Sequence, residues 1–213
     1  MSIDPLIDRL SADLRPVRRR TPLRDAALLL LLGAVEMAGF AGMGTMRPDL
    51  SAAMALPSFW WKAISLALIA LVGGGAAILS LSPIRSPRRG VRAAVMLVLA
   101  TLAAGWLVDA ARAGGASLGQ RLDPVHGIIC ATKIVLLSLP AVAAFGLLMR
   151  RGAPTDRRGS AAAAGMAAAA WGALVFMLAC PFDDPLYVAV WYLLGGGVTA
   201  LAARLVLPPL TRW

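Results

Sequence analysis

The sequence is poor in charged residues. Only 15% of its 213 residues are Asp, Glu, Lys or Arg, against about 25% in ordinary soluble domains. Hydrophobic residues make up 59% of the chain, which is more apolar surface than a soluble globule of this size can bury. The composition therefore excludes a disordered chain, a fibrous repeat and a soluble enzyme, and it indicates an integral membrane protein.

Cysteine and histidine are also scarce. The chain has two cysteines and one histidine, and it contains no CxxC motif and no tight cluster of His and Cys. This excludes a disulfide-rich secreted domain. Cys130, Cys180 and His126 remain as candidates for a redox or metal site, and they can form one only if the fold brings them together.

Six segments are long and apolar enough to cross a bilayer. A helical span needs about 20 mostly apolar residues, because the hydrocarbon core is roughly 30 Å thick and a helix rises about 1.5 Å per residue. We expect helices near residues 25–45, 60–82, 92–112, 128–149, 160–180 and 186–207. The predicted fold class is all-α, a polytopic membrane protein with a segment 1–24, a six-helix domain 25–207 and a tail 208–213. The first apolar run is too long for a cleavable signal peptide, so we expect it to remain as a span.

The basic residues are distributed unevenly about these spans. Sixteen of the 21 lie before the first span, in alternate loops, or after the last span. The other side holds only Arg47, Lys62, Arg112, Arg121 and Lys133. The positive-inside rule then places both termini in the cytoplasm and three short loops outside, in the periplasm of a bacterium with two membranes. Topology accounts for the net charge of +10, and we expect no direct contact with nucleic acid.

The N-terminal segment carries an apolar stripe at helical spacing. The stripe consists of Leu6, Ile7, Leu10 and Leu14. Pro16 ends the predicted helix, and a run of arginines follows. One interpretation is an amphipathic helix that lies on the membrane with the arginines on anionic lipid. The other is a ligand for a groove in a cytosolic protein, which Asp8 and Asp13 favour because lipid-binding helices tend to be basic.

The topology places both cysteines at the outer surface of the membrane. Cys130 begins the fourth predicted span, and Cys180 ends the fifth. Three interpretations remain open: a disulfide in an oxidising compartment, a soft-metal site for copper or zinc with His126 as a third ligand, or two separate cysteines packed as small apolar residues.

A few ionisable residues lie in or near the predicted spans. Glu36 is in the middle of the first span, where a carboxylate commonly pairs or faces the interior of a bundle. Lys62 and Lys133 are placed to extend their amines toward the interface, and Asp109 is spaced to pair with Arg112. Residues expected to lie in an interfacial belt are Trp60, Trp61, Trp191, Tyr192 and Trp213. We interpret these groups as interhelical pairs and interface anchors in preference to an ion path.

Several motifs together resemble one bacterial family. They are LIDRLSADLRPVRR at 6–19, PSFWWK at 57–62, the segment around Cys130 and Lys133, CPFDDPLYVAVWY at 180–192 and the closing Arg212-Trp213. Over nearly the whole chain they resemble the six-helix inner-membrane anti-sigma factors called negative regulator of sigma F. Two positions differ from the family pattern, because Ala179 and Phe182 replace a His and a Glu beside the second cysteine.

The resemblance implies a function. The N-terminal segment would hold an extracytoplasmic-function sigma factor at the membrane through Leu6, Ile7, Leu10 and Leu14. Cys130 and Cys180 would sense a periplasmic metal or oxidant, with a soft metal such as copper or zinc as the possible ligand and His126 as an accessory. Loss of the His and Glu favours thiol oxidation or a cysteine-only site over a larger metal site.

Two other functions compete with this one. The first is a small transporter or channel with Glu36 as its buried switch, and the second is a membrane thiol oxidoreductase that uses Cys130 and Cys180. The absence of a CxxC motif counts against the second, and we do not expect an enzyme.

Overall fold

The computed structural model describes residue 12 and residues 20–110 and 117–211, and this part of the chain is helical without any strand. The long helices are α2 (Pro22–Gly42), α4 (Pro57–Ser80), α5 (Arg88–Ala110), α7 (Pro124–Arg151), α8 (Arg157–Phe176) and α10 (Leu193–Leu210). A short α9 (Pro185–Tyr187) and a π turn η1 (Val188–Tyr192) lead into α10, and short helices α3 (Leu50–Ala53) and α6 (Leu118–Leu122) lie in two loops. Six helices are long and apolar enough to cross a membrane, which confirms the all-α, six-span prediction.

Prolines set where several of these helices begin. Pro22, Pro57, Pro124 and Pro185 each occupy the first turn of a helix, where the missing N–H has no intrahelical partner to lose. The helices therefore start a few residues before the apolar runs from which the spans were predicted. The predicted starts of these helices differ from the observed starts for this reason.

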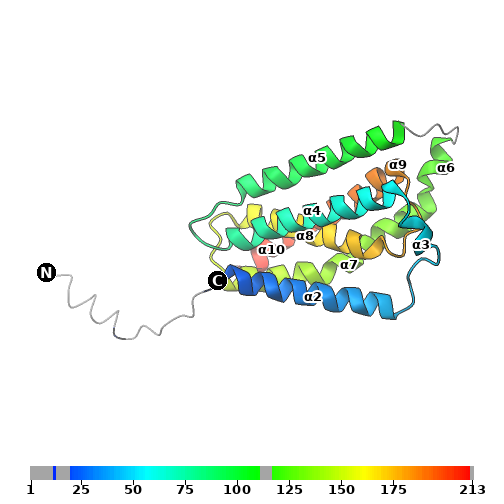
Figure 1. The fold of residues 1–213 in the computed structure, drawn as a ribbon. Coiled ribbons are helices and arrows are strands. Elements are labelled where there is room, and N and C mark those ends of the chain that lie inside the picture. Colours follow the sequence, from blue (N-terminus) through cyan, green and yellow to red (C-terminus); the bar gives the residue numbers. More distant parts are fainter. Residues whose placement is uncertain (1–11, 13–19, 111–116, 212–213) are drawn as a thin grey trace.

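Consecutive long helices run in opposite directions, so the bundle has two distinct ends (Figure 1). The arginine end holds the α4–α5 and α7–α8 loops with Arg85, Arg88 and Arg157. The cysteine end holds α3, α6 and α9 together with Cys130 and Cys180. Both cysteines therefore lie at one end of the bundle, as the alternating topology predicted.

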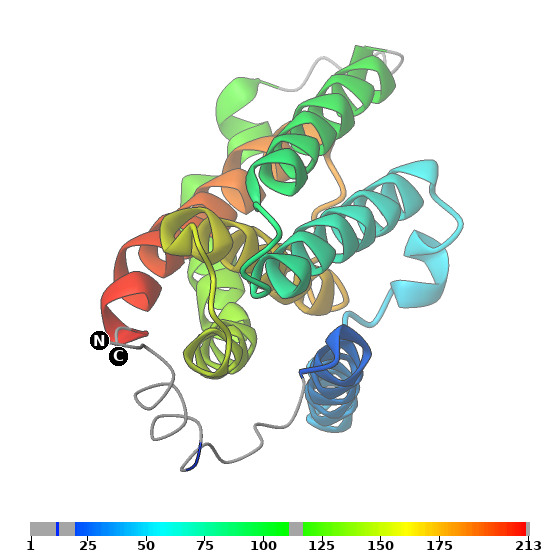
Figure 2. The same cartoon turned by 90° about the vertical axis from the view of Figure 1, so that its left-hand side faces the viewer.

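The alanine-rich α8 forms the centre of the bundle and packs against α4, α7 and α10 (Figure 2). Glycines allow the closest approaches. A Cβ at Gly172 would lie 2.4 Å from the Ser138 Oγ of α7, and one at Gly165 would lie 2.8 Å from the Ala200 Cα of α10. The small residues of α8 thus allow the helix backbones to approach closely. This is expected in a bilayer, where the hydrophobic effect does not drive helices together and close van der Waals packing does.

Helix α2 lies at the edge of the bundle (Figure 2). Of its 21 residues only Asp25, Gly33 and Phe40 are buried. A mostly apolar cavity of about 400 Å³ separates part of α2 from α4, α7 and α8. Large apolar side chains such as Leu31 and Val35 are exposed on its outer surface, which suits contact with lipid.

Candidate functional site

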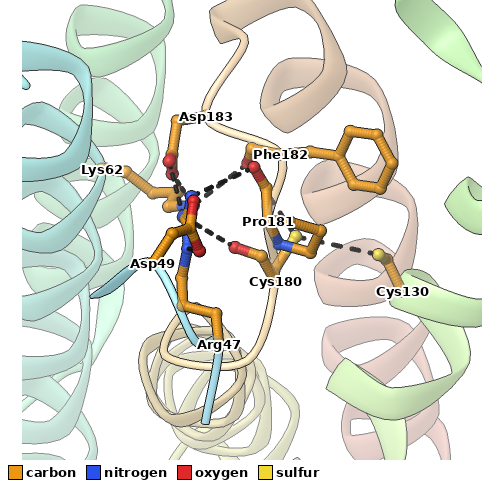
Figure 3. Close-up of polar contacts among 8 residues, drawn as sticks. All are labelled: Arg47, Asp49, Lys62, Cys130, Cys180, Pro181, Phe182 and Asp183. Carbon is orange, nitrogen blue, oxygen red and sulfur yellow. Dashed lines mark hydrogen bonds and ion pairs between the residues drawn. The ribbon is translucent and has the colours of Figure 1, made fainter. Parts of the chain in front are cut away.

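Two free thiols meet at the cysteine end (Figure 3). Cys130 lies in the second turn of α7, and Cys180 follows the turn that ends α8. Their Sγ atoms are 3.9 Å apart, although the residues are 50 positions apart in the chain. Cys130 is 4% exposed and Cys180 is 0% exposed. The fold therefore brings the two sulfurs into contact and covers them.

Aromatic side chains from the start of the last span cover the thiols. The Tyr187 hydroxyl donates to the Cys130 Sγ at 3.1 Å, and the Phe182 ring stacks on Tyr187 with centroids 4.5 Å apart. Tyr192 belongs to the same buried cluster. The π turn explains this pairing of tyrosines, because its hydrogen bonds join residues five apart and bring Tyr187 and Tyr192 toward one face.

An arginine from the loop after α2 holds the backbone beside Cys180. The Arg47 guanidinium donates to the Cys180 carbonyl at 3.0 Å and to the Pro181 carbonyl at 3.3 Å. It also pairs with the Asp183 carboxylate at 2.6 Å and makes a two-point contact with Asp49. The contacts with Cys180, Pro181 and Asp183 converge on the segment that carries the second thiol, and Asp49 holds the guanidinium from within its own loop.

A lysine from α4 completes this cluster. The Lys62 Nζ donates to the Phe182 carbonyl at 3.1 Å and pairs with Asp183 at 2.5 Å. The side chains of Lys62, Arg47 and Asp183 are 0%, 4% and 8% exposed. We call Arg47, Asp49, Lys62 and Asp183 the Arg47 cluster. Buried charges of this kind persist only when they are paired and hydrogen-bonded.

A second ion pair holds the other end of the same segment. Arg121 of α6 makes two hydrogen bonds with Asp184, at 2.8 and 2.9 Å, and also pairs with Asp109 of α5. Asp184 in turn caps α9 by accepting from the Leu186 amide. Residues 180–184 are therefore held from α2 and α4 on one side and from α5 and α6 on the other.

These contacts shift the acidity of the segment. The hydrogen bond with Cys130, assisted by the charge of Lys62, lowers the pKa of the Cys180 thiol against the opposing effect of burial. Burial raises the pKa of the Asp184 carboxyl, but its hydrogen bonds with Arg121 and with the α9 backbone outweigh burial and leave that pKa below the ordinary 3.8. Cys180 is thus the thiol that ionises more readily than usual, and the thiolate is the reactive and ligating form.

The thiol pair suits a two-sulfur site. With metal–sulfur bonds of about 2.3 Å, sulfurs 3.9 Å apart subtend about 115° at a shared ion. Among the described residues no group of three His, Cys, Asp or Glu side chains is close enough to hold a metal. The His126 ring instead contacts the Asp123 carboxylate at 2.7 Å. The geometry thus favours thiol oxidation or a soft ion held mainly by sulfur.

Other residues predicted from the sequence have mixed outcomes. Leu6, Ile7, Leu10 and Leu14 lie outside the described residues. Glu36 accepts a hydrogen bond from the Trp171 indole of α8 at 2.9 Å, which fits the interpretation as an interhelical pair.

Two sequence predictions about polar and aromatic residues are wrong. Lys62 does not extend to the interface, because Asp183 and the Phe182 carbonyl draw its amine inward. Tyr192 is buried beside the thiols and does not lie in an interfacial belt. Asp109 pairs with Arg121 from another helix; its expected partner Arg112 lies outside the described residues, so the pairing of Asp109 with Arg112 stays a prediction.

The Arg47 cluster and the Arg121 pair were not predicted from the sequence. A signal was present, because the five basic residues of the outward segments are matched by five acids. These acids are Asp49, Asp109, Asp123, Asp183 and Asp184. Equal numbers of opposite charges in short loops favour mutual pairing, and two of the acids directly follow Cys180, Pro181 and Phe182.

Comparison with known proteins places the chain in a family. The family described as "Negative regulator of sigma F" matches residues 10–213. The chain is 34% identical over 200 residues to the anti-sigma-F factor NrsF of Caulobacter vibrioides, with 92% of each chain covered. It is 30% identical over 217 residues to the probable anti-sigma-F factor NrsF of Azospira oryzae, with both chains fully covered. No solved structure matches. The chain therefore belongs to the family of negative regulators of sigma F.

Proposed function

We propose that this protein is a multi-pass inner-membrane anti-sigma factor with both termini in the cytoplasm. Residues 1–24 sequester an extracytoplasmic-function sigma factor, and the protein releases it when Cys130 and Cys180 react with a periplasmic metal or oxidant. The family membership supports the regulatory role, and the charge asymmetry of the loops supports the orientation. The protein acts by binding and release and is not an enzyme.

The observation that carries the sensing role is the 3.9 Å separation of the two sulfurs. A disulfide requires a sulfur–sulfur distance of about 2.05 Å, so a closure of roughly 2 Å joins the pair. In that step a thiol-reactive oxidant accepts two electrons, two protons leave the thiols and one S–S bond forms. A soft cation instead displaces the thiol protons and binds both sulfurs. Either reaction joins α7 to the segment after α8 at the sulfurs, through an S–S bond or through a shared ion.

The sensing role is tested by substitution of each cysteine. We expect Cys130→Ser and Cys180→Ser each to abolish sigma-dependent transcription in cells exposed to cadmium or to an oxidant, while the protein still reaches the membrane. Thr132→Ser is the matched control, because Thr132 is exposed on the same helix as Cys130. If both cysteine variants respond as the control does, the thiol pair is not the sensor.

The sequestering role is tested in the N-terminal segment. We expect deletion of residues 1–20, or Leu10→Asp combined with Leu14→Asp, to release the sigma factor without stress and to leave the membrane domain folded. Arg9→Gln, outside the apolar stripe, is the control and retains binding. Co-purification of the sigma factor with membranes measures the result, and unchanged binding after the Leu substitutions contradicts the role of the stripe.

A further inference from the structure

One side chain joins the thiol segment to the first span. Arg47 lies five residues after the end of α2 at Gly42. Its guanidinium contacts the Cys180 and Pro181 carbonyls and the Asp183 carboxylate, and its backbone amide donates to the Leu178 carbonyl at 2.9 Å. The chain just after α2 is therefore attached to both sides of Cys180 (Figure 3).

This attachment contrasts with the weak packing of α2 elsewhere. Most of the helix faces outward, and a cavity of about 400 Å³ lies against its inner face. Near its middle, Glu36 accepts a hydrogen bond from the Trp171 indole. A helix packed against a cavity can change its tilt with little loss of contact, so its position depends strongly on how its end is held.

The Arg47 cluster is hydrogen-bonded directly to the backbone of Cys180, one of the two reacting residues. The Cys180 carbonyl that accepts from Arg47 belongs to the residue whose Sγ is 3.9 Å from Cys130. A disulfide ties the Cys180 side chain to α7, and any displacement of the Cys180 backbone that accompanies its formation is passed to the carbonyl that Arg47 holds. Hydrogen bonds weaken steeply with distance and angle, so the Arg47 contacts either follow this displacement or break.

We propose that Arg47 is the positioning residue that couples the thiol pair to α2, so that a reaction at Cys130 and Cys180 changes the position of the helix next to the sigma-binding segment. This rests on the proposed function. Lys62 and Asp183 serve the same coupling by fixing the segment on which Arg47 acts. Arg121 binds the other end of that segment through Asp184, but its contacts lead to α5 and α6 and not to α2.

The test measures coupling as a ratio. Full-length protein in native membranes is reduced, or oxidised with copper-phenanthroline, and the bound fraction of sigma factor is measured in each state. A maleimide-polyethylene-glycol gel shift reports in parallel how much of the thiol pair has been oxidised. In the wild type we expect the bound fraction to fall at least tenfold on oxidation. In Arg47→Ala we expect thiols that still oxidise but a ratio close to one.

Arg121→Ala is the matched control, because it removes a comparable two-point ion pair from the same segment. We expect it to keep most of the wild-type ratio. Arg47→Lys, which keeps the charge but has fewer donors for the two carbonyls, should lie between the wild type and Arg47→Ala. It also provides a variant for the test if Arg47→Ala fails to accumulate.

The outcomes separate this inference from the proposed function. If the wild-type ratio itself is near one although the thiols oxidise, thiol-dependent release is wrong, and the coupling falls with it. If the wild type responds and Arg47→Ala responds equally, only the coupling through Arg47 is wrong. Equal losses in Arg47→Ala and Arg121→Ala likewise overturn it, since the segment would then act through general stability.

Discussion

Asp183 is shared by two buried cations, and its replacement should open the thiol segment. Arg47 and Lys62 approach its two carboxylate oxygens at 2.6 and 2.5 Å. Asp183→Asn removes the carboxylate that pairs with Lys62 and one of the two that pair with Arg47, which keeps Asp49, so the Lys62 charge is left without its described acidic partner away from water. Breaking a buried pair in this way costs about 3–5 kcal/mol, because the remaining charge stays uncompensated. Lys62→Met, in contrast, leaves the Arg47–Asp183 pair intact.

The assay is the rate at which Cys180 reacts with a maleimide in detergent-solubilised protein, with Cys130→Ser as the background. Cys180 is 0% exposed, so labelling requires local opening of the segment. A cost of about 3–5 kcal/mol converts to an increase of roughly 10²- to 4 × 10³-fold in the open population, at about 1.4 kcal/mol per factor of ten. We expect an increase of this size for Asp183→Asn and of at most about 30-fold for Lys62→Met, where a hydrogen bond worth about 1–2 kcal/mol is lost. Equal rates in the two variants would refute the reasoning that the shared carboxylate holds the segment.

Two further predictions concern packing and pH. Gly172→Leu should lower the melting temperature of the solubilised protein by more than about 6 °C. A Cβ at Gly172 already meets α7 atoms at 2.4 Å, and overpacking of this kind costs about 1–3 kcal/mol or more. Gly75→Ala, with nothing within 4 Å of its Cβ, should have a melting temperature equal to or slightly above that of the wild type. The Asp184 carboxyl has a pKa lowered below 3.8 on folding, so its contribution to stability is present above that value and is lost as pH falls through the lower folded pKa. The rate of Cys180 labelling, relative to the rate in denatured protein, should therefore not depend on this ion pair between pH 5 and 7, where ordinary carboxyl groups are ionised. Below pH 3.8 the relative rate should rise in the wild type but not in Arg121→Ala.

Much of the fold follows from two properties of the sequence, length and hydropathy. A bilayer imposes a length on each helix, and six apolar runs of that length occur, so the number of spans and their alternation were predictable. The boundaries were less accurate because caps and prolines such as Pro57 lie outside the apolar runs that signal a span. The π turn at Val188–Tyr192 was not predictable from periodicity, since a single inserted residue per turn hardly changes an apolar pattern.

The thiol pair was predictable only to the level of a shared membrane surface. Alternating spans place Cys130 and Cys180 at the same end, but an end of a six-helix bundle is wide enough to hold them far apart. Their contact depends on α7 and α8 being neighbours at close range, which the small residues of α8 permit. The Arg47 cluster was harder still, because five cations and five acids in the outward segments allow many pairings, and each pairing depends on the bundle geometry.

The strengths of the contacts along α2 indicate where this helix is held most firmly. At the arginine end, the Arg20–Asp25 ion pair joins residues five apart in the chain and does not tie α2 to another span. In the middle, the Glu36–Trp171 hydrogen bond is worth about 1.5–3 kcal/mol at most, as a bond to a charged group. At the cysteine end, disruption of the Arg47 cluster costs about 3–5 kcal/mol. A switch from 99:1 to 1:99 occupancy needs about 5.5 kcal/mol. Of the described contacts of α2, those at the cysteine end therefore come nearest to the energy that such a switch requires, and this supports the proposal that a reaction at Cys180 acts on α2 through Arg47 in the loop that follows it.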